Sequence, residues 1–270
     1  MTGPAVLTTR VVPHLRPGRN AARILERNLL VYRHAWMVLF SGFFEPLFYL
    51  FSVGVGIGSL VGEVAGPGGR AVDYAAYVAP ALLGSSAMNG AIYESTGNLF
   101  FKLKYGRIYD AILSTPMQPA DIAVGEVSWS LIRGALYATG FLVVMAAMGL
   151  ILSPWAVLAL PAATLIGFAF GACGMAATTY MRSWQDMDLV GLVTMPLFLF
   201  SATFYPLDVY PAPFQVITRF SPLYHSVEII RSLTLGAFDW SLAGHVAFLL
   251  GMGGVGVLIA SRRLAKLLLR

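Results

Sequence analysis

Residues 155–181 read WAVLALPAATLIGFAFGACGMAATTYM and contain no charged side chain. A helix needs roughly 20 apolar residues to cross about 30 Å of bilayer hydrocarbon, so this stretch is long enough to span a membrane. The whole chain has the same character, with 57% hydrophobic and only 11% charged residues, whereas soluble domains carry about 25% charged residues. A soluble protein of this composition would lack a polar surface. The sequence therefore predicts an all-α membrane protein.

Basic residues set the predicted orientation of the spans. Six stretches are long and apolar enough to cross: 35–61, 74–98, 125–150, 155–181, 188–206 and 239–261. Cytoplasmic loops carry an excess of Lys and Arg. With the N-terminus inside, only Arg70, Arg219 and Arg231 of the 18 Lys and Arg fall outside, and Arg133 lies within a span. We therefore predict six transmembrane helices, N-in/C-in, with a cytoplasmic N-terminal segment over 1–34 and a transmembrane domain over 35–270.

The segment before the first span predicts a helix on the membrane surface. In RNAARILERNLLVYR (19–33) arginines recur every fourth residue with aliphatic side chains among them, at Arg19, Arg23 and Arg27. Such an amphipathic interfacial helix would lie on the inner leaflet, where basic side chains meet anionic lipid. The alternative is a plain topology signal that forms no helix.

Several classes of function lack their motifs. The chain has no G-x-x-x-x-G-K-S/T phosphate loop, no H-E-x-x-H and no G-x-S-x-G. Cys173 is the only cysteine, which excludes an internal disulfide or a cysteine-based metal cluster. The net charge of +5 lies at the flanks of spans, without the basic groove and interleaved aromatics of a nucleic-acid binder. We expect no catalytic site, metal site, bound cofactor or nucleic-acid partner.

The charged residues in or near the predicted spans include Glu45, Glu94, Glu126 and Arg133. Each such charge costs about 2.5–3.5 kcal/mol at the centre of a membrane helix. We therefore expect these side chains to face protein or water. Glu94 and Arg133 can also lie close enough to the cytoplasm to be solvated or paired. Pro46 predicts a kink beside Glu45.

The basic loop between the second and third spans reads FFKLKYGRIYDAILSTPMQPADI (100–122). A topology signal would need only its charges, but here tyrosines alternate with the basic residues and prolines close the segment. This pattern predicts a short surface helix offered to a partner. Its candidate contact residues are Lys102, Lys104, Tyr105, Arg107, Tyr109 and Asp110.

The last outer segment, 207–238, contains SPLYHSVEIIRSL (221–233). In a helix His225, Glu228 and Arg231 follow one another at intervals of three, which predicts one charged stripe. The opposite side carries the apolar residues Leu223, Val227 and Ile230.

Several motifs together resemble the membrane subunits of ABC-2-type exporters, in the branch that includes nodulation-factor and daunorubicin export permeases. The motifs are YEST (93–96), YDAILSTPM (109–117), IAVGEVSW (122–129), FSATFYPLDVYPAPFQ (200–215) and PLYHSVEIIR (222–231). The likeness covers about residues 20–265. Ala202 departs from the pattern, because the family more often has glycine there.

The resemblance implies a dimer of six-span membrane subunits, alike or homologous, bound to two ATPase subunits that carry ATP and Mg. It also implies that the 99–124 loop and the N-terminal helix dock on the ATPase. The segment between spans 5 and 6 would form an extracellular re-entrant helical hairpin, divided by Pro206, Pro211, Pro213 and Pro222. Its apolar side would pack on the bundle and its charged stripe would face the exit. The charged residues would then either form an internal network that holds the hairpin or act as a gate.

The resulting prediction is a permease subunit of an ATP-driven ABC exporter in the bacterial cytoplasmic membrane. Its substrate would be amphipathic, such as a lipid-linked glycan, a lipooligosaccharide or a hydrophobic drug. One alternative is an ion-coupled secondary transporter that uses Glu45 and Glu94 as a proton relay. Another is a membrane-embedded lipid-modifying enzyme, for which the sequence offers no clustered acids and no histidine-based nucleophile.

Overall fold

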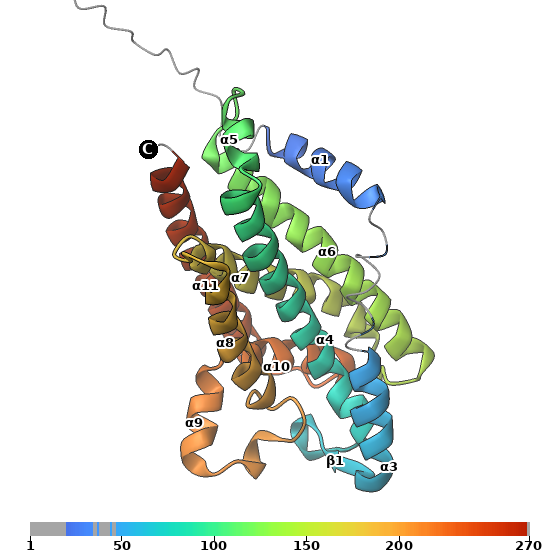
Figure 1. Cartoon of the computed structure of the whole chain (residues 1–270). Helices are drawn as coiled ribbons and strands as arrows, with labels where there is room; N and C mark the ends of the chain where they lie inside the picture. The colour runs from blue at the N-terminus through green and yellow to red at the C-terminus, as the bar shows by residue number, and fades with distance from the viewer. Residues whose placement is uncertain (1–19, 35–36, 38–43, 45–46, 269–270) are drawn as a thin grey trace, which may run out of the picture.

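The computed structural model describes residues 20–34, 37, 44 and 47–268, which form a helical bundle (Figure 1). The α-helices are α1 (Ala21–His34), α3 (Gly58–Val61), α4 (Tyr74–Tyr93), α5 (Ile108–Leu113), α6 (Pro119–Ala147), α7 (Ala159–Thr178), α8 (Met187–Leu199), α9 (Ala212–Phe220), α10 (Pro222–Leu235) and α11 (Ser241–Leu268). The π-helical segments are η1 (Leu50–Ile57), η3 (Glu94–Asn98) and η4 (Phe101–Tyr105). The 3₁₀ segments are η2 (Pro67–Gly69), η5 (Pro154–Leu158), η6 (Trp184–Asp186) and η7 (Leu207–Val209).

The centre of the bundle is made by helices rich in small residues. Both α4 and α7 are buried over most of their length. They contact each other, α6 and α10, and α7 also contacts α11. Small residues let membrane helices approach closely. A Cβ on Gly253 of α11 would lie 2.3 Å from the Phe168 ring, and one on Gly256 would lie 2.8 Å from the Ala172 carbonyl carbon. These two glycines therefore set the separation of α7 and α11.

Three stretches of the described chain are helical, long and apolar enough to cross a membrane. They are Asp121–Ala147, Pro154–Thr178 and Ser241–Leu267, which correspond to the predicted spans 125–150, 155–181 and 239–261. Leu47–Val61 is a shorter apolar helix at the end of the predicted span 35–61. The predicted span 74–98 is continuous helix, because η3 extends α4.

The predicted span 188–206 ends earlier than expected. Its helix α8 has 13 residues and stops at Leu199. Pro196 lies inside α8, and proline both removes a backbone donor and crowds the preceding turn. Phe200 then leaves helical geometry, and Ala202 has a φ of 55°. The helical part of this span is therefore about 20 Å long, shorter than the sequence predicted.

The chain is mostly helical, as predicted, and the segment 62–73 between two predicted spans forms a small β-hairpin. There Glu63–Ala65 (β1) and Ala71–Asp73 (β2) pair as an antiparallel hairpin, with Val64 opposite Val72. Gly68 and Gly69 form its turn with φ near +75°, a conformation that costs glycine little. The turn residues allow the chain to fold back, and the hairpin lies at one end of the bundle (Figure 1).

Two short helices, α9 and α10, occupy the segment after α8. Proline stands at or next to the first residue of each helix, where its fixed φ suits a helix start. Leu223, Val227 and Ile230 of α10 are fully buried in the main apolar core with α4 residues. The predicted apolar side of α10 therefore packs on the bundle. In Figure 1 α9 projects away from it.

The predicted N-terminal helix is present as α1, which lies along α6 (Figure 1). One side of α1 buries Ile24 and Asn28 against the bundle. On the other side Leu29 and Leu30 are exposed beside Arg33. A helix with exposed aliphatic and basic side chains suits the boundary between lipid and water.

Candidate functional site

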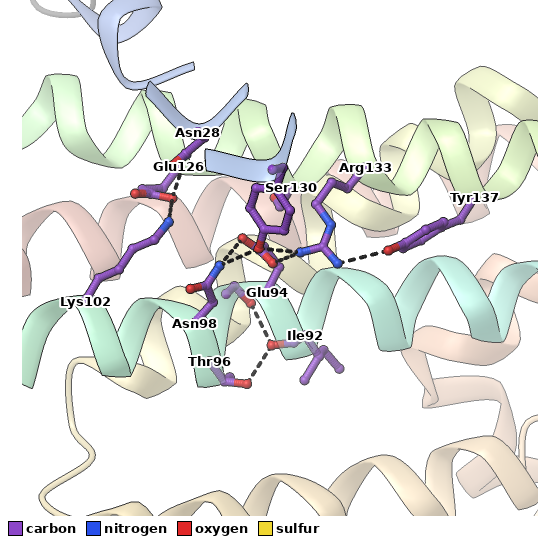
Figure 2. Close-up of polar contacts among 12 residues, drawn as sticks. Asn28, Ile92, Glu94, Thr96, Asn98, Lys102, Glu126, Ser130, Arg133 and Tyr137 are labelled. Atoms are coloured by element: carbon purple, nitrogen blue, oxygen red, sulfur yellow. Dashed lines mark hydrogen bonds and ion pairs between the residues drawn. The ribbon is translucent and has the colours of Figure 1, made fainter. Parts of the chain in front are cut away.

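Two acidic and two basic side chains form cross-pairs between two antiparallel segments near one end of the bundle (Figure 2). Glu94 and Lys102 lie on the π-helical continuation of α4, and Glu126 and Arg133 lie on α6. Lys102 pairs with Glu126, and Arg133 pairs with Glu94. We call these four residues the charge cluster. Each segment contributes one acid and one base, so the cluster fixes the register of the two segments.

Glu126 accepts hydrogen bonds from three different elements. Lys102 Nζ lies 2.7 Å from Glu126 Oε2, Tyr109 Oη lies 3.1 Å from Oε1, and Asn28 Nδ2 lies 3.3 Å from Oε2. Burial raises the pKa of the Tyr109 hydroxyl well above its ordinary value of 10.0, so this hydroxyl stays protonated and donates. A buried carboxylate needs such partners to offset its lost hydration. Glu126 thus joins η4, α5, α6 and α1.

Arg133 and Glu94 form the second pair with their own set of partners. Arg133 Nη2 donates to Tyr137 Oη at 2.9 Å, and Nη1 donates to Glu94 and, at 3.0 Å, to Tyr32 Oη. Asn98 Nδ2 donates to Glu94 Oε1 at 2.6 Å. The guanidinium carbon lies 5.0 Å from the centre of the Tyr32 ring, within the range of a cation–π contact. Of the alternatives that the sequence left open, Glu94 and Arg133 are therefore paired, and they pair with each other.

Helix α1 is tied to the charge cluster at two points. Asn28 bonds Glu126, and Tyr32, one turn later, accepts hydrogen bonds from Asn98 and Arg133. One turn before Asn28 the two helices approach closely, because a Cβ on Gly125 would lie 2.5 Å from Ile24 Cβ. The absence of a side chain at position 125 is what allows α1 to lie on α6.

The basic loop 100–122, which the sequence analysis expects to dock on the ATPase and which we call the coupling segment, has an inner face and an outer face. Lys102 and Tyr109 point inward and are buried, with Tyr109 packed in a small apolar core beside Leu99 and Ile122. Their placement against Glu126 was not expected, because we assigned both to the partner surface. Because Glu126 is buried, its carboxylate needs a cation and a hydrogen-bond donor. This segment supplies them as Lys102 and Tyr109.

The outer face consists of Lys104, Tyr105, Arg107 and Asp110, all exposed. Tyr105 stacks on Phe101 with ring centres 6.2 Å apart, which keeps the aromatic ring ordered at the surface. Within the described chain, no ion pair involves Lys104, Arg107 or Asp110. Arg107, the residue before α5, has a φ of 43°, so the chain turns sharply there.

The remaining predicted residues near the membrane surface have simpler surroundings. Arg19 and Glu45 lie outside the described residues. Arg23 forms an exposed ion pair with Glu26 at 3.0 Å, and Arg27 donates to Asn28 Oδ1 at 3.3 Å. Arg27 thus supports the residue that bonds Glu126.

The three charged residues of α10 do not form one stripe. Arg231 is 2% exposed, its guanidinium carbon lies 3.9 Å from the centre of the Tyr77 ring, and it donates to Glu228 at 2.9 Å. The expectation that Arg231 faces the exit was wrong. Each step of three residues falls about 60° short of a full helical turn, so His225 and Arg231 point about 120° apart.

His225 faces a different helix from Arg231. Its Nδ1 lies 2.6 Å from Nδ1 of His245 on α11, and its ring stacks on Phe248 with centres 4.0 Å apart. Helix α10 is therefore attached to α4 through Arg231 and to α11 through His225. Glu228 forms an ion pair with Arg231 and so neutralises its charge.

Arg231 also holds the bend after α8. Its Nη2 donates to the Ala202 carbonyl at 2.8 Å, and Thr218 Oγ1 donates to the Phe200 carbonyl at 2.9 Å. Ala202 has a φ of 55°, the left-handed region that favours glycine. This conformation explains why glycine would be the more usual residue at position 202.

Several residues of these contacts escaped the sequence analysis. Asn28, Tyr32, Asn98, Tyr137, Tyr77 and His245 are uncharged polar or aromatic residues inside apolar helices. One signal was available, since Glu94, Asn98 and Lys102 recur every fourth residue and must share a helix face.

Comparison with known proteins identifies the family. The ABC-2 type transporter family matches residues 20–235. The chain belongs to the ABC-2 type transporter family. It is 34% identical over 234 residues to Nodulation protein J of Rhizobium leguminosarum bv. trifolii, covering 85% of this chain and 87% of that relative. It is 32% identical over 257 residues to Nodulation protein J of Rhizobium leguminosarum bv. viciae, covering 94% and 96% of the two chains.

Family membership confirms the resemblance and its coarser consequences. Proteins of this family are the membrane permeases of transporters, and they work with ABC ATPase subunits. The permease is not itself the catalytic part. The chain is thus a membrane protein by family and by its apolar helices.

Proposed function

We propose that this chain is the permease subunit of an ATP-driven exporter in the bacterial cytoplasmic membrane. It crosses the membrane six times with both termini inside, and it moves an amphipathic molecule outward, such as a lipid-linked glycan, a lipooligosaccharide or a hydrophobic drug. Two copies of an ATP-binding subunit hold ATP and Mg, and a second permease chain, the same or homologous, completes the pathway.

The two faces of the coupling segment carry this proposal. The outer face, with Tyr105, Arg107 and Asp110, is exposed and offers an aromatic ring and charges of both signs. Aromatic and arginine side chains are the usual anchors of protein interfaces. The inner face is fixed to the bundle through Lys102 and Tyr109. A partner that holds the outer face would therefore move the bundle with it.

The charge cluster supplies the mechanical connection. A displacement of η4 and α5 is transmitted to α6 through Glu126, and to α1 through Asn28. The second pair, Glu94–Arg133, then holds the end of α4 to α6. Ion pairs buried among several hydrogen bonds are stiff because every alternative arrangement leaves a charge without a partner.

The arrangement of the ends supports the proposed topology. Helices α1 and α5 and the C-terminal end of α11 gather at one end of the bundle, and the β1–β2 hairpin lies at the other (Figure 1). The first end carries the clustered Lys and Arg of 99–124 and of the last turns of α11, as the positive-inside rule requires of the cytoplasmic side.

The energy source decides between this proposal and an ion-coupled transporter. In inverted membrane vesicles that contain the chain and its ATP-binding partner, substrate uptake should require hydrolysable ATP and should persist when the proton gradient is collapsed. Uptake that follows the proton gradient without ATP would overturn the proposal. The isolated chain should hydrolyse no ATP, because it lacks a phosphate loop.

A further inference from the structure

A cavity of about 720 Å³ lies between α8 and the rest of the bundle. This volume falls within the range of about 300–1,000 Å³ that is typical of small-molecule sites. Helices α4, α7, α10 and α11 form one wall, with Phe170, Cys173 and Met252 among the lining residues, and α8 forms the other with Val193 and Leu197. None of the residues of α8 is buried, so this wall is held loosely.

The middle of the cavity suits an apolar occupant. Besides Tyr180, two residues with hydroxyl groups line the cavity, and both already donate to their own helices: Thr96 Oγ1 to the Ile92 carbonyl at 2.6 Å, and Thr194 Oγ1 to the Gly191 carbonyl at 3.4 Å. A water molecule needs two to four polar partners to remain in a cavity. The lining here offers it few, so a hydrocarbon chain fits better than water.

One end of the cavity carries an arginine. Arg182 lies there with Tyr180 and Asp186, and the Arg263 guanidinium carbon lies 4.2 Å from the centre of the Tyr180 ring. The Asp186 carboxylate accepts the backbone N–H groups of Arg182 and Ser183 at 2.6 and 3.3 Å. Within the described residues no ion pair satisfies the guanidinium of Arg182. This end can therefore meet an anion.

We infer that the cavity binds one acyl chain of an anionic amphiphile. Its head group lies at Arg182, and its chain runs along α8 past Leu189 and Val193, which line the cavity. Helix α8 from Leu189 to Leu197 gives the chain a run of about 12 Å. The identification of this occupant as the exported molecule rests on the proposed function, but the binding itself does not.

The chain contains its own reporter for this site. Cys173 is its only cysteine, and its thiol lines the cavity. The rate of its modification by N-ethylmaleimide therefore measures occupancy without any introduced label. The measurement uses the full chain in phosphatidylcholine nanodiscs, without ATPase or ATP, so that it is independent of export.

Dodecyl phosphate is the anionic probe, and dodecylphosphocholine is its zwitterionic counterpart. At ten times its dissociation constant, dodecyl phosphate should slow modification of Cys173 about tenfold, and dodecylphosphocholine should protect less at the same concentration. Val193→Trp fills the cavity and should abolish protection, whereas Met195→Trp, exposed on the same helix outside the cavity, should not. Arg182→Gln should remove the preference for the anion, and Arg262→Gln should keep it.

Two results would overturn the inference: protection that survives Val193→Trp, and equal protection by the two head groups. Full protection by phosphatidylglycerol placed in the nanodisc would support the inference and would identify membrane lipid as the amphiphile. Loss of ATP-driven export with protection intact would instead count against the proposed function alone.

Discussion

Glu126 and Lys102 are each more than nine-tenths buried as side chains, so removal of one charge leaves the other without its partner. Breaking such a pair costs about 3–5 kcal/mol. We expect Glu126→Gln to lower the thermal unfolding midpoint of the detergent-solubilised chain by at least about 5 °C, measured by loss of monomer on size-exclusion chromatography after heating.

Two companion variants isolate the pair. Glu26→Gln removes an exposed ion pair with Arg23 and should leave the midpoint within about 1 °C, because exposed pairs contribute little. Lys102→Met added to Glu126→Gln should recover part of the lost stability, since an uncharged pair leaves no buried charge. A midpoint for Glu126→Gln equal to that of Glu26→Gln would contradict the role given to the pair.

Single residues show where sequence reasoning stops. The sequence identified Glu94, Glu126, Arg133 and Lys102 as notable, and all four meet in the charge cluster. It could not tell that Lys102 points inward while Lys104 points outward, because that depends on the helical register of η4 and on the acid it must neutralise. Arg231 was misplaced because three-residue spacing was treated as alignment, although it drifts about 60° per step.

The packing of helix α1 on helix α6 depends on Gly125. Gly125→Ala would place a Cβ 2.5 Å from Ile24 Cβ, so α1 should move away from α6. A Cβ at Gly134 of the same helix meets nothing within 4 Å, which makes Gly134→Ala a matched control with the same gain in helix propensity.

Displacement of α1 can be measured by thiol labelling. In a Cys173→Ser background, Asn28→Cys places a thiol at a position that is 2% exposed. Its modification by maleimide should become several-fold faster with Gly125→Ala and stay unchanged with Gly134→Ala. Equal labelling in both variants would show that α1 does not rest on α6 through this glycine.

The positions of helices could be predicted from the sequence where length and apolar composition determine them. The three longest apolar helices matched their expected positions, and α10 packs by the predicted apolar side. The end of α8 and the β1–β2 hairpin were not predictable, because each depends on backbone geometry. Ala202 adopts a conformation that its residue type disfavours, and it is held by Arg231 from a distant part of the chain.

We expect the two ends of the helical bundle to lie on opposite sides of the membrane. In a Cys173→Ser background, Arg70→Cys in the hairpin turn and Thr115→Cys after α5 place thiols at exposed positions. With a membrane-impermeant maleimide in spheroplasts, Arg70→Cys should be labelled at once and Thr115→Cys only after permeabilisation. The reverse pattern would contradict the N-in/C-in orientation.

The central claim is that the outer face of the coupling segment holds an ATP-binding subunit while the inner face holds the bundle. The most direct measurement is the amount of ATP-binding subunit that co-purifies with Tyr105→Ala, Arg107→Gln and Asp110→Asn, compared with the unchanged chain. Each variant should keep its membrane abundance and thermal midpoint, yet retain severalfold less partner, since interface anchors contribute about 2 kcal/mol or more. Undiminished retention of the partner in all three variants would contradict the account.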